Sequence, residues 1–233
     1  MWVNTKYRSN EEEIMDDLDM EGDLLIDTLD KIASINKWLG GNKLTLQGVD
    51  KLIKSHTKSE ITIVDLGCGN GDMLRELADI GRIKKLKLKL IGIDANQATI
   101  DYAVMLSSKY SNIRYVKLDV LSDEFNKINY DIALSTLFLH HFKNDVALDL
   151  MQSLVAKARI GVIVNDLHRH ALAYYLFKFI TLFINNRMVK TDGLISILRG
   201  FKRKDLEQFA MHIKSISYIK WKWAFRYQWI IYK

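Results

Sequence analysis

The chain has 233 residues, of which 48% are hydrophobic and 27% are charged, so it is long enough to bury a full core in one domain. This composition excludes intrinsic disorder, and the single cysteine, Cys68, excludes a small scaffold held together by disulfides. The N-terminus shows no basic and then apolar leader, so we expect a reducing, cytoplasmic location. Proline is absent, which excludes every motif that requires one.

The net charge of +6 is distributed unevenly along the chain. Residues 1–31 hold ten acidic and three basic residues, a net charge of −7, which leaves +13 for the rest. Such a basic body is typical of a lysine-rich surface in water, but it also attracts nucleic acids and anionic membranes. Because ten carboxylates would lie near a bound phosphate, we do not expect a nucleic-acid partner, and peripheral contact with a membrane stays open. The acidic segment could also fold against the basic body.

The first 58 residues are predicted to form two helices. Apolar residues recur at three-, four- and seven-residue steps from Glu11 to about Trp38, which indicates a helical stripe that ends at Gly40-Gly41. A second helix is predicted over residues 45–55. Neither segment carries obvious chemistry, so we assign residues 1–58 to an N-terminal helical cap and residues 59–233 to the main domain.

From Glu60 onward, short apolar strands alternate with helices. We predict five strands, over residues 61–64, 88–93, 113–118, 130–135 and 160–164. This alternation indicates an α/β fold, a Rossmann-like doubly wound sheet that is mostly parallel and covered on both faces. Ligands bind such a sheet at the carboxyl ends of its strands. The polar residues that fall there are Asp65, Asp94, Asp119, Ser135 and Asp166.

The C-terminal residues break this pattern. From Lys220 to Tyr232, aromatic and apolar residues recur with a period of two, which predicts one or two antiparallel strands at the edge of the sheet, paired with residues 213–219. Aromatic residues that alternate with basic ones can also stack on nucleic-acid bases, but inward-facing aromatics in a strand are far more common. No glycine or asparagine marks the position of a turn.

Three glycines at alternate positions, Gly67, Gly69 and Gly71, follow the first predicted strand and open a helix. Such a loop lets a ligand lie against bare backbone, next to the unpaired N–H groups of the helix start. The dinucleotide-binding pattern G-x-G-x-x-G would need a third glycine at position 72, where the chain has Asp72. A P-loop is also excluded, because no Gly-Lys-Ser/Thr sequence follows.

The run Val64-Asp65-Leu66-Gly67-Cys68-Gly69-Asn70-Gly71 resembles the signature of class I S-adenosylmethionine-dependent methyltransferases, and Asp94 supplies the acid that this family has at the end of the next strand. The resemblance covers about residues 60–165. It implies that Asp94 accepts hydrogen bonds from the ribose hydroxyls, and that Asp119 accepts one from the adenine amino group. The residues that it assigns to S-adenosyl-L-methionine are Asp65, Gly67, Cys68, Gly69, Gly71, Asp94, Ala95, Asp119, Val120 and Ser135.

Some of these residues also fit a purely structural role. An aspartate at the end of a strand often forms a turn or caps a helix, and for Asp119 both roles stay open. Asp65 and Asp94 are joined to the glycines at the family's spacing, which favours the binding role. Cys68 is most simply a small buried filler and not a nucleophile.

A histidine pair, His140 and His141, follows the fourth predicted strand. Enzymes that methylate amino groups of bases or of glutamine often carry Asp/Asn-Pro-Pro-aromatic there, which a chain without proline cannot have. The pair instead resembles that of the quinone-biosynthesis type, and because imidazole titrates near neutrality, either histidine is a candidate catalytic base. Both could also simply pack under or cap the next helix. Two histidines are too few for a zinc site, so we expect no metal.

The fifth predicted strand ends in Asn165-Asp166-Leu167-His168-Arg169-His170. His168 is a further candidate base, and Asp166 and Arg169 are candidate substrate-binding residues, with Arg169 suited to an anionic or phenolate oxygen. This stretch also resembles bacterial small-molecule methyltransferases found with polyketide synthases that make phenolic lipids, as do Arg8-Ser9 and residues 35–41 and 192–196. Each of these polar groups could instead face water.

Residues 171–184 are apolar almost throughout, but they are too few to span a bilayer. They could form a buried core helix, an interfacial helix or a lid over an apolar acceptor. Because this insertion follows the fifth strand, above the predicted pocket, we favour a lid at about residues 168–200. A helix is predicted over residues 205–211.

Together, these patterns predict an S-adenosylmethionine-dependent methyltransferase whose acceptor is an oxygen or carbon of a small aromatic, quinone or polyketide-derived molecule. Two alternatives stay open. An RNA or protein methyltransferase is favoured by the basic body, including residues 84–89. A non-catalytic partner protein could keep the cofactor pocket and act through its apolar lid or tail. Whether the protein is a monomer or a homodimer also stays open.

Overall fold

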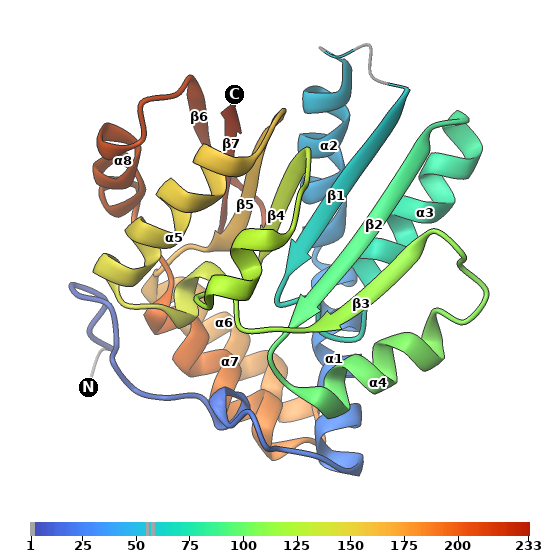
Figure 1. Cartoon of the computed structure of the whole chain (residues 1–233). Helices are drawn as coiled ribbons and strands as arrows, with labels where there is room; N and C mark the ends of the chain where they lie inside the picture. Colours follow the sequence, from blue (N-terminus) through green and yellow to red (C-terminus); the bar gives the residue numbers. More distant parts are fainter. Residues whose placement is uncertain (1–2, 55, 57–58) are drawn as a thin grey trace.

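A seven-stranded sheet in the order β3-β2-β1-β4-β5-β7-β6 forms the centre of the molecule (Figure 1). The computed structural model describes residues 3–54, 56 and 59–233. The strands are β1 Glu60–Leu66, β2 Lys87–Asp94, β3 Ile113–Lys117, β4 Ile132–Thr136, β5 Gly161–Leu167, β6 Ser217–Lys222 and β7 Arg226–Tyr232. The first five pair in parallel, whereas β7 lies antiparallel to both β5 and β6. The predicted mostly parallel, Rossmann-like sheet with an antiparallel C-terminal edge is confirmed.

The register brings the carboxyl ends of the central strands to one edge. Leu66 at the end of β1 pairs with Ile93 of β2 and with Ser135 of β4, and Ser135 in turn pairs with Val164 of β5. Strand β1 therefore lies between β2 and β4, where the strand order reverses. In open α/β sheets this reversal leaves a crevice at the carboxyl ends, which is where ligands bind.

Helices cover both faces of the sheet. Successive β1 residues point to opposite faces, so Ile63 packs with helices α2 (Gly41–Lys54) and α3 (Asp72–Lys84), and Val64 packs with α5 (Asn144–Lys157) and α8 (Arg203–His212). Helix α4 (Gln97–Leu106) packs beside β2 and β3. Burial on both faces explains why β1, β4 and β5 read as short apolar runs, whereas β2 begins with an alternation of exposed lysines and buried leucines.

The predicted helix from Glu11 to Trp38 is wrong in its first half. Only one 3-10 turn, η1 (Ile14–Asp16), forms there, and helix α1 begins at Asp23, after Gly22 with φ 86°. The backbone N–H groups of Ile14 and Met15 donate to the carboxylate of Asp192, which holds this segment against helix α7 (Arg187–Arg199). Contacts with residues far along the chain thus override the helical pattern.

Helix α2 is part of the layer that covers the sheet. It begins at Gly41, four residues before the predicted start, and its Val49 and Leu52 lie in the same core cluster as Ile163 of β5. The predicted end of this helix at residue 55 and the predicted domain boundary after residue 58 lie outside the described residues. The division into a cap and a main domain stays a prediction.

Helices α1, α6 (Ala171–Ile180) and α7 gather at the carboxyl edge of the sheet, and the N-terminal segment crosses this group (Figure 1). Three further 3-10 turns are η2 (Asp123–Lys127), η3 (Leu139–His141) and η4 (Thr181–Phe183). On α6 and η4, Phe179 and Phe183 are exposed to solvent. In the described part of the chain, no helix has the length and apolar character to cross a membrane.

The C-terminal alternation is divided between two strands. Strand β6 ends at Lys222 and β7 begins at Arg226, and the turn between them contains Phe225 with φ 53°. The predicted antiparallel pairing is confirmed, but the partner strand lies over residues 217–222, which pair with residues 226–231, and not over the predicted residues 213–219. The chain reverses without a glycine or asparagine, which is why the sequence does not mark this turn.

Candidate active site

The glycine loop joins β1 to α3 in a left-handed backbone conformation. Gly67, Gly69 and Gly71 have φ values of 62°, 51° and 79°, which residues with a side chain rarely adopt. A Cβ at Gly67 would collide with the ring of Phe138, and one at Gly71 would collide with the hydroxyl of Tyr115. At Gly69 a Cβ would meet only Leu29, at an ordinary distance of 3.7 Å. Gly69 is therefore the glycine whose bare backbone has open space beside it.

Asp94 ties this loop to the end of β2. Its Oδ2 accepts a hydrogen bond of 3.2 Å from the N–H of Gly69, and its Oδ1 accepts one of 3.1 Å from the N–H of Asn96. Burial raises the pKa of Asp94, although these backbone hydrogen bonds oppose the shift. The side chain of Asn96 caps α4 and also donates to the carbonyls of Leu18 and Met20, so the N-terminal segment is held at this site.

Asp65 is a buried carboxylate that has no counter-charge among the residues that the structure describes. It is only 3% exposed, and its Oδ1 has no hydrogen-bond partner among the described residues. Burial, with the charges of Asp72 and Asp94, raises the pKa of Asp65 well above its ordinary value. Since Asp65 lines the cavity described next, a positively charged ligand group could pair with it.

One cavity of about 720 Å³ occupies the carboxyl edge of the sheet. It extends from the glycine loop and Asp94 to the histidine pair and to apolar side chains of the predicted lid. The lid side chains on its wall are Ala173, Leu176, Phe177, Phe179 and Ile180 of α6 and Val189 and Ile197 of α7. Helix α1 adds Leu25, Leu29 and Ile32. The predicted lid segment therefore forms an apolar wall of the same cavity that contains the glycine loop.

His140 is held in place by Asp166. The imidazole is 2% exposed, its Nδ1 lies 2.6 Å from Oδ1 of Asp166, and its backbone N–H donates to Oδ2 at 3.1 Å. Burial would raise the pKa of Asp166, but the charge and hydrogen bonds of His140 lower it below its ordinary value. An ionised Asp166 can only accept a hydrogen bond, so Nδ1 of His140 carries a proton. When the His140 ring is neutral, its lone pair is therefore on Nε2. That Nε2 has no hydrogen-bond partner in the described part of the chain.

His141 is held in a similar way by Asp16. Its Nδ1 lies 2.7 Å from Oδ1 of Asp16, and its ring stacks on that of His140 with 4.4 Å between the ring centres. Burial would raise the pKa of Asp16, but hydrogen bonds from His141 and Arg199 hold it well below its ordinary value. Both histidines therefore have an acidic partner at Nδ1, and both line the cavity.

Comparison with known proteins identifies the family of the central segment. Residues 63–161 match the family model described as "Methyltransferase domain". This central segment is therefore a methyltransferase domain of the class I, S-adenosylmethionine-dependent type. No curated protein matches the chain significantly in sequence.

Solved structures show the same fold at low sequence identity. The plantazolicin methyltransferase BpumL in complex with SAH has a TM-score of 0.65 and 14% identity, over 90% of this chain and 96% of that one. An O-methyltransferase family protein from Burkholderia thailandensis has a TM-score of 0.62 and 12% identity, over 88% and 59%. The CMeT domain of the citrinin polyketide synthase has a TM-score of 0.60 and 13% identity, over 79% and 50%.

The methyltransferase cofactor, S-adenosylmethionine, fits the residues on one side of the cavity. Asp94 would accept hydrogen bonds from the ribose, and the unpaired carboxylate of Asp65 would face the ammonium group. Gly67, Cys68, Gly69, Ala95 and Val120 also line the cavity. Burial raises the pKa of the Cys68 thiol well above its ordinary value, which agrees with a filler and not a nucleophile.

Three residues predicted to bind the cofactor differ in whether they line the cavity. Asp119 lines the cavity, and its Oδ1 accepts a hydrogen bond of 2.9 Å from the N–H of Leu121, so it has the turn role, and its cofactor-binding role stays a prediction. Ser135 is buried within β4 and is not on the cavity wall. Gly71 is also absent from the wall, because Tyr115 covers it. Its left-handed φ serves the start of α3.

The substrate-side predictions require three corrections. Asp166 is absent from the cavity wall and positions His140 from behind. Arg169 is also absent from the wall, because its guanidinium donates to the carbonyls of Thr5 and Gly200 and pairs with Asp205. His168 lines the cavity, but burial and the charge of His170 lower its pKa to about 4. An imidazole of such low basicity is a poor proton acceptor at neutral pH.

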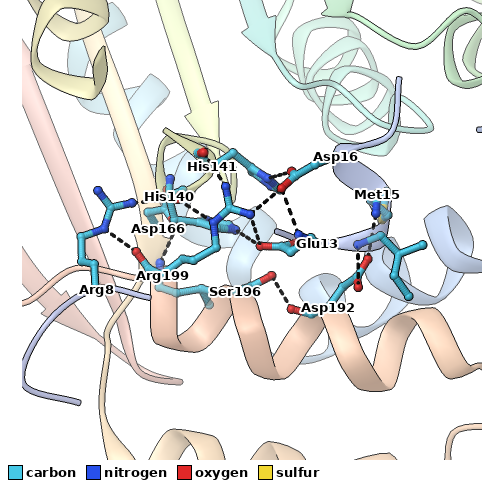
Figure 2. A network of polar contacts seen from close by, with 12 residues as sticks. Arg8, Glu13, Met15, Asp16, His140, His141, Asp166, Asp192, Ser196 and Arg199 are labelled. Carbon is cyan, nitrogen blue, oxygen red and sulfur yellow. Dashed lines mark hydrogen bonds and ion pairs between the residues drawn. The ribbon is translucent and has the colours of Figure 1, made fainter. Parts of the chain in front are cut away.

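Sequence reasoning missed the N-terminal part of the site (Figure 2). Glu13 is buried, and burial raises its pKa. The guanidinium of Arg199 pairs with Asp16 and lies 3.5 Å from Oε1 of Glu13. Arg8 donates to the carbonyls of His140 and Arg199. The only signal for these contacts is the opposite charge of the acidic segment and the basic body, which does not identify individual residues.

Glu13, His140 and His141 place three ligating atoms within 4.8 Å of one another. The sequence predicts no metal because two histidines are too few, and Glu13 supplies a third group of the ligating type. However, Arg199 already provides a positive charge beside Glu13 and Asp16. We therefore keep the absence of a metal as a prediction.

Proposed function

We propose that this methyltransferase transfers a methyl group to an oxygen or carbon of a small aromatic, quinone or polyketide-derived acceptor. The observation that carries the proposal is the single cavity that joins Asp94 and the glycine loop to His140 and the apolar lid. Its volume of about 720 Å³ lies within the range of small-molecule sites, roughly 300–1,000 Å³. Acceptor and cofactor would thus share one cavity.

His140 is the residue best placed to take a proton from the acceptor. When bound, S-adenosylmethionine supplies a methyl group on a sulfonium for an in-line displacement. The acceptor O–H or acidic C–H gives its proton to Nε2 of His140, while Nδ1–H stays on the hydrogen bond to Asp166. The imidazolium that results lies between Asp166 and Glu13, whose Oε1 is 3.7 Å from Nε2. This arrangement follows the logic of a carboxylate-oriented histidine base.

The character of the cavity wall supports an apolar aromatic acceptor. Side chains such as Leu176, Phe177 and Ile197 of the lid exclude water and offer surface to a flat ring. Among the described residues, Arg226 is the one lysine or arginine on the wall, whereas Glu13 and Asp16 are acidic. A nucleic-acid substrate needs several phosphate contacts, so no feature of this cavity favours RNA.

Two measurements test the proposal together. The first is calorimetric binding of S-adenosylhomocysteine to the native chain and to Asp94→Ala, where we expect binding that the substitution abolishes. The second is mass spectrometry of phenols and hydroxyquinones incubated with S-adenosylmethionine, where we expect a methylated product. Cofactor binding without transfer to any acceptor would contradict the proposed acceptors and favour a non-catalytic partner protein. Absence of cofactor binding would contradict the proposal entirely.

A further inference from the structure

An arginine that binds an anionic ligand must line the cavity and keep N–H groups unpaired. Arg169 does not meet this requirement, but a second arginine, Arg226, does. It is the first residue of β7, it pairs in register with Leu167 at the end of β5, and it lines the cavity. Arg226 and Arg169 are both only 2% exposed. The two differ in their partners, because Arg169 is saturated by two carbonyls and Asp205.

The guanidinium of Arg226 is buried, and two of its three nitrogens lack a partner among the described residues. Its Nε and Nη1 atoms are buried and have no hydrogen-bond partner in the described part of the chain. Burial lowers the pKa of Arg226 to about 10, so the group still carries its charge at neutral pH. The acid that acts on it through its charge is Asp166, whose oxygens are committed to His140 and to the N–H of Leu167. A buried unpaired guanidinium costs free energy, which an anionic ligand in the cavity would recover.

The surroundings of Arg226 leave room for this group and contain further polar side chains. At Gly41, an added Cβ would come within 1.9 Å of Oδ1 of Asn36 and 3.0 Å of Cζ of Arg226, so the absence of a side chain there makes space for the Asn36 amide and for the guanidinium beside it. Asn36, Asn42 and Thr136 also line the cavity, and Oδ1 of Asn36 has no hydrogen-bond partner among the residues described. These polar groups lie on the same wall as the apolar residues Trp223, Ala224 and Phe225, which directly precede Arg226.

We infer that Arg226 binds an anionic group of the acceptor, so that the acceptor is an aromatic acid with a carboxylate attached to its ring. A guanidinium offers two parallel N–H donors, which match the two oxygens of a carboxylate. The acceptor would then be oriented by Arg226 at one end and would present its reacting atom to His140. This inference rests on the proposed acceptor class and narrows it. The cofactor also has a carboxylate, and the experiment must separate these two sources.

The experiment compares pairs of ligands that differ only in charge. Calorimetry measures binding of benzoate, salicylate and 2,4-dihydroxybenzoate, each against its amide, to the protein saturated with S-adenosylhomocysteine. We expect the native protein to bind at least one acid about 10- to 100-fold more tightly than its amide, the range of a charged hydrogen bond. We expect Arg226→Met to lose this preference, and Arg226→Lys to keep part of it. Because no turnover is needed, failure of methyl transfer would not affect this result.

Arg169→Met is the matched control, since it removes an equally buried arginine that is fully paired. It should lower the melting temperature and leave the preference for acids unchanged. Arg226→Met should not lower the melting temperature of the free protein, because it removes an unpaired charge. A large loss of stability in Arg226→Met would assign Arg226 a structural role and overturn the inference. Failure of the native protein to prefer any acid over its amide would overturn it as well.

The last part of the experiment tests whether Arg226 binds the carboxylate of the cofactor. Binding of S-adenosylhomocysteine and of its decarboxylated analogue is measured for native and Arg226→Met protein. We expect the substitution to change both affinities by less than threefold, a factor well below one charged hydrogen bond. A loss of about 10-fold or more for S-adenosylhomocysteine alone would assign Arg226 to the cofactor and overturn its role toward the acceptor.

Discussion

Replacing Gly69 by alanine should weaken cofactor binding while the protein stays folded. The backbone at Gly69 has φ 51°, and an alanine in the left-handed region costs about 1–2 kcal/mol. No steric clash adds to this cost, because the new Cβ would contact only Leu29, at an ordinary distance of 3.7 Å. For a chain of this size, each kcal/mol lowers the melting temperature by about 2–4 °C, so we expect a loss of about 2–8 °C. The protein should stay folded at room temperature.

The new methyl group would stand in the open space beside the loop, where the cofactor lies against the backbone. We therefore expect the affinity for S-adenosylhomocysteine to fall at least tenfold, which corresponds to about 1.4 kcal/mol. Gly40→Ala is the control, since Gly40 also has a positive φ of 76° and open space around it, but does not line the cavity. Calorimetry and thermal unfolding are measured for both variants. Equal cofactor affinities of Gly69→Ala and Gly40→Ala would refute the assignment of the glycine loop to cofactor binding.

Three further predictions concern the buried charges. The raised pKa of Asp65 means that the folded state binds its proton more tightly, so between the ordinary pKa of 3.8 and the folded value the native protein loses stability as pH rises. Asp65→Asn removes this loss, so in urea unfolding of the free protein its stability relative to the native chain should rise with pH above 3.8, by up to about 1.4 kcal/mol per pH unit; a stability difference that stays constant from pH 4 upward would contradict this. His140→Gln should lower the rate of methyl transfer about 10²–10⁴-fold, whereas exposed His212→Gln should leave it unchanged; equal rates would remove His140 as the base. Removal of divalent ions with a chelator should not change the rate, because Arg199 already supplies the positive charge beside Glu13; activity that is lost and then restored by Zn²⁺ would show that the site binds a metal.

The glycine loop and the acid at the end of the next strand could be located from the sequence because their signals are local. The strand before the loop reads as a short apolar run, and the glycines mark the positions that need a left-handed backbone. Asp94 follows from the next strand, since parallel pairing brings both carboxyl ends to one edge. Ser135 and Gly71 show the limit of this reasoning. Their positions in the chain are correct for the motif, but packing within β4 and against Tyr115 keeps both off the cavity wall.

The acceptor side could not be predicted because it depends on contacts between distant residues. The sequence favours Arg169, which directly follows the fifth strand, over Arg226, which stands within a long aromatic alternation. The turn at residues 223–225 divides this alternation and makes Arg226 the first residue of β7. Because β7 lies antiparallel to β5, its beginning meets the carboxyl end of β5, where the site is. A turn without glycine or asparagine gives no sequence signal for this register.

The uneven charge of the chain also has a structural reason. Carboxylates of the acidic segment meet cations of the body at the site, where Asp16 pairs with Arg199. Asp192 accepts the N–H groups of Ile14 and Met15, so the same segment is fastened to α7 next to the lid. A helix over these residues would have used those N–H groups internally and carried the carboxylates away from His141. The non-helical path of the N-terminal segment, with its one 3-10 turn at Ile14–Asp16, is therefore what brings Glu13 and Asp16 to the histidine pair.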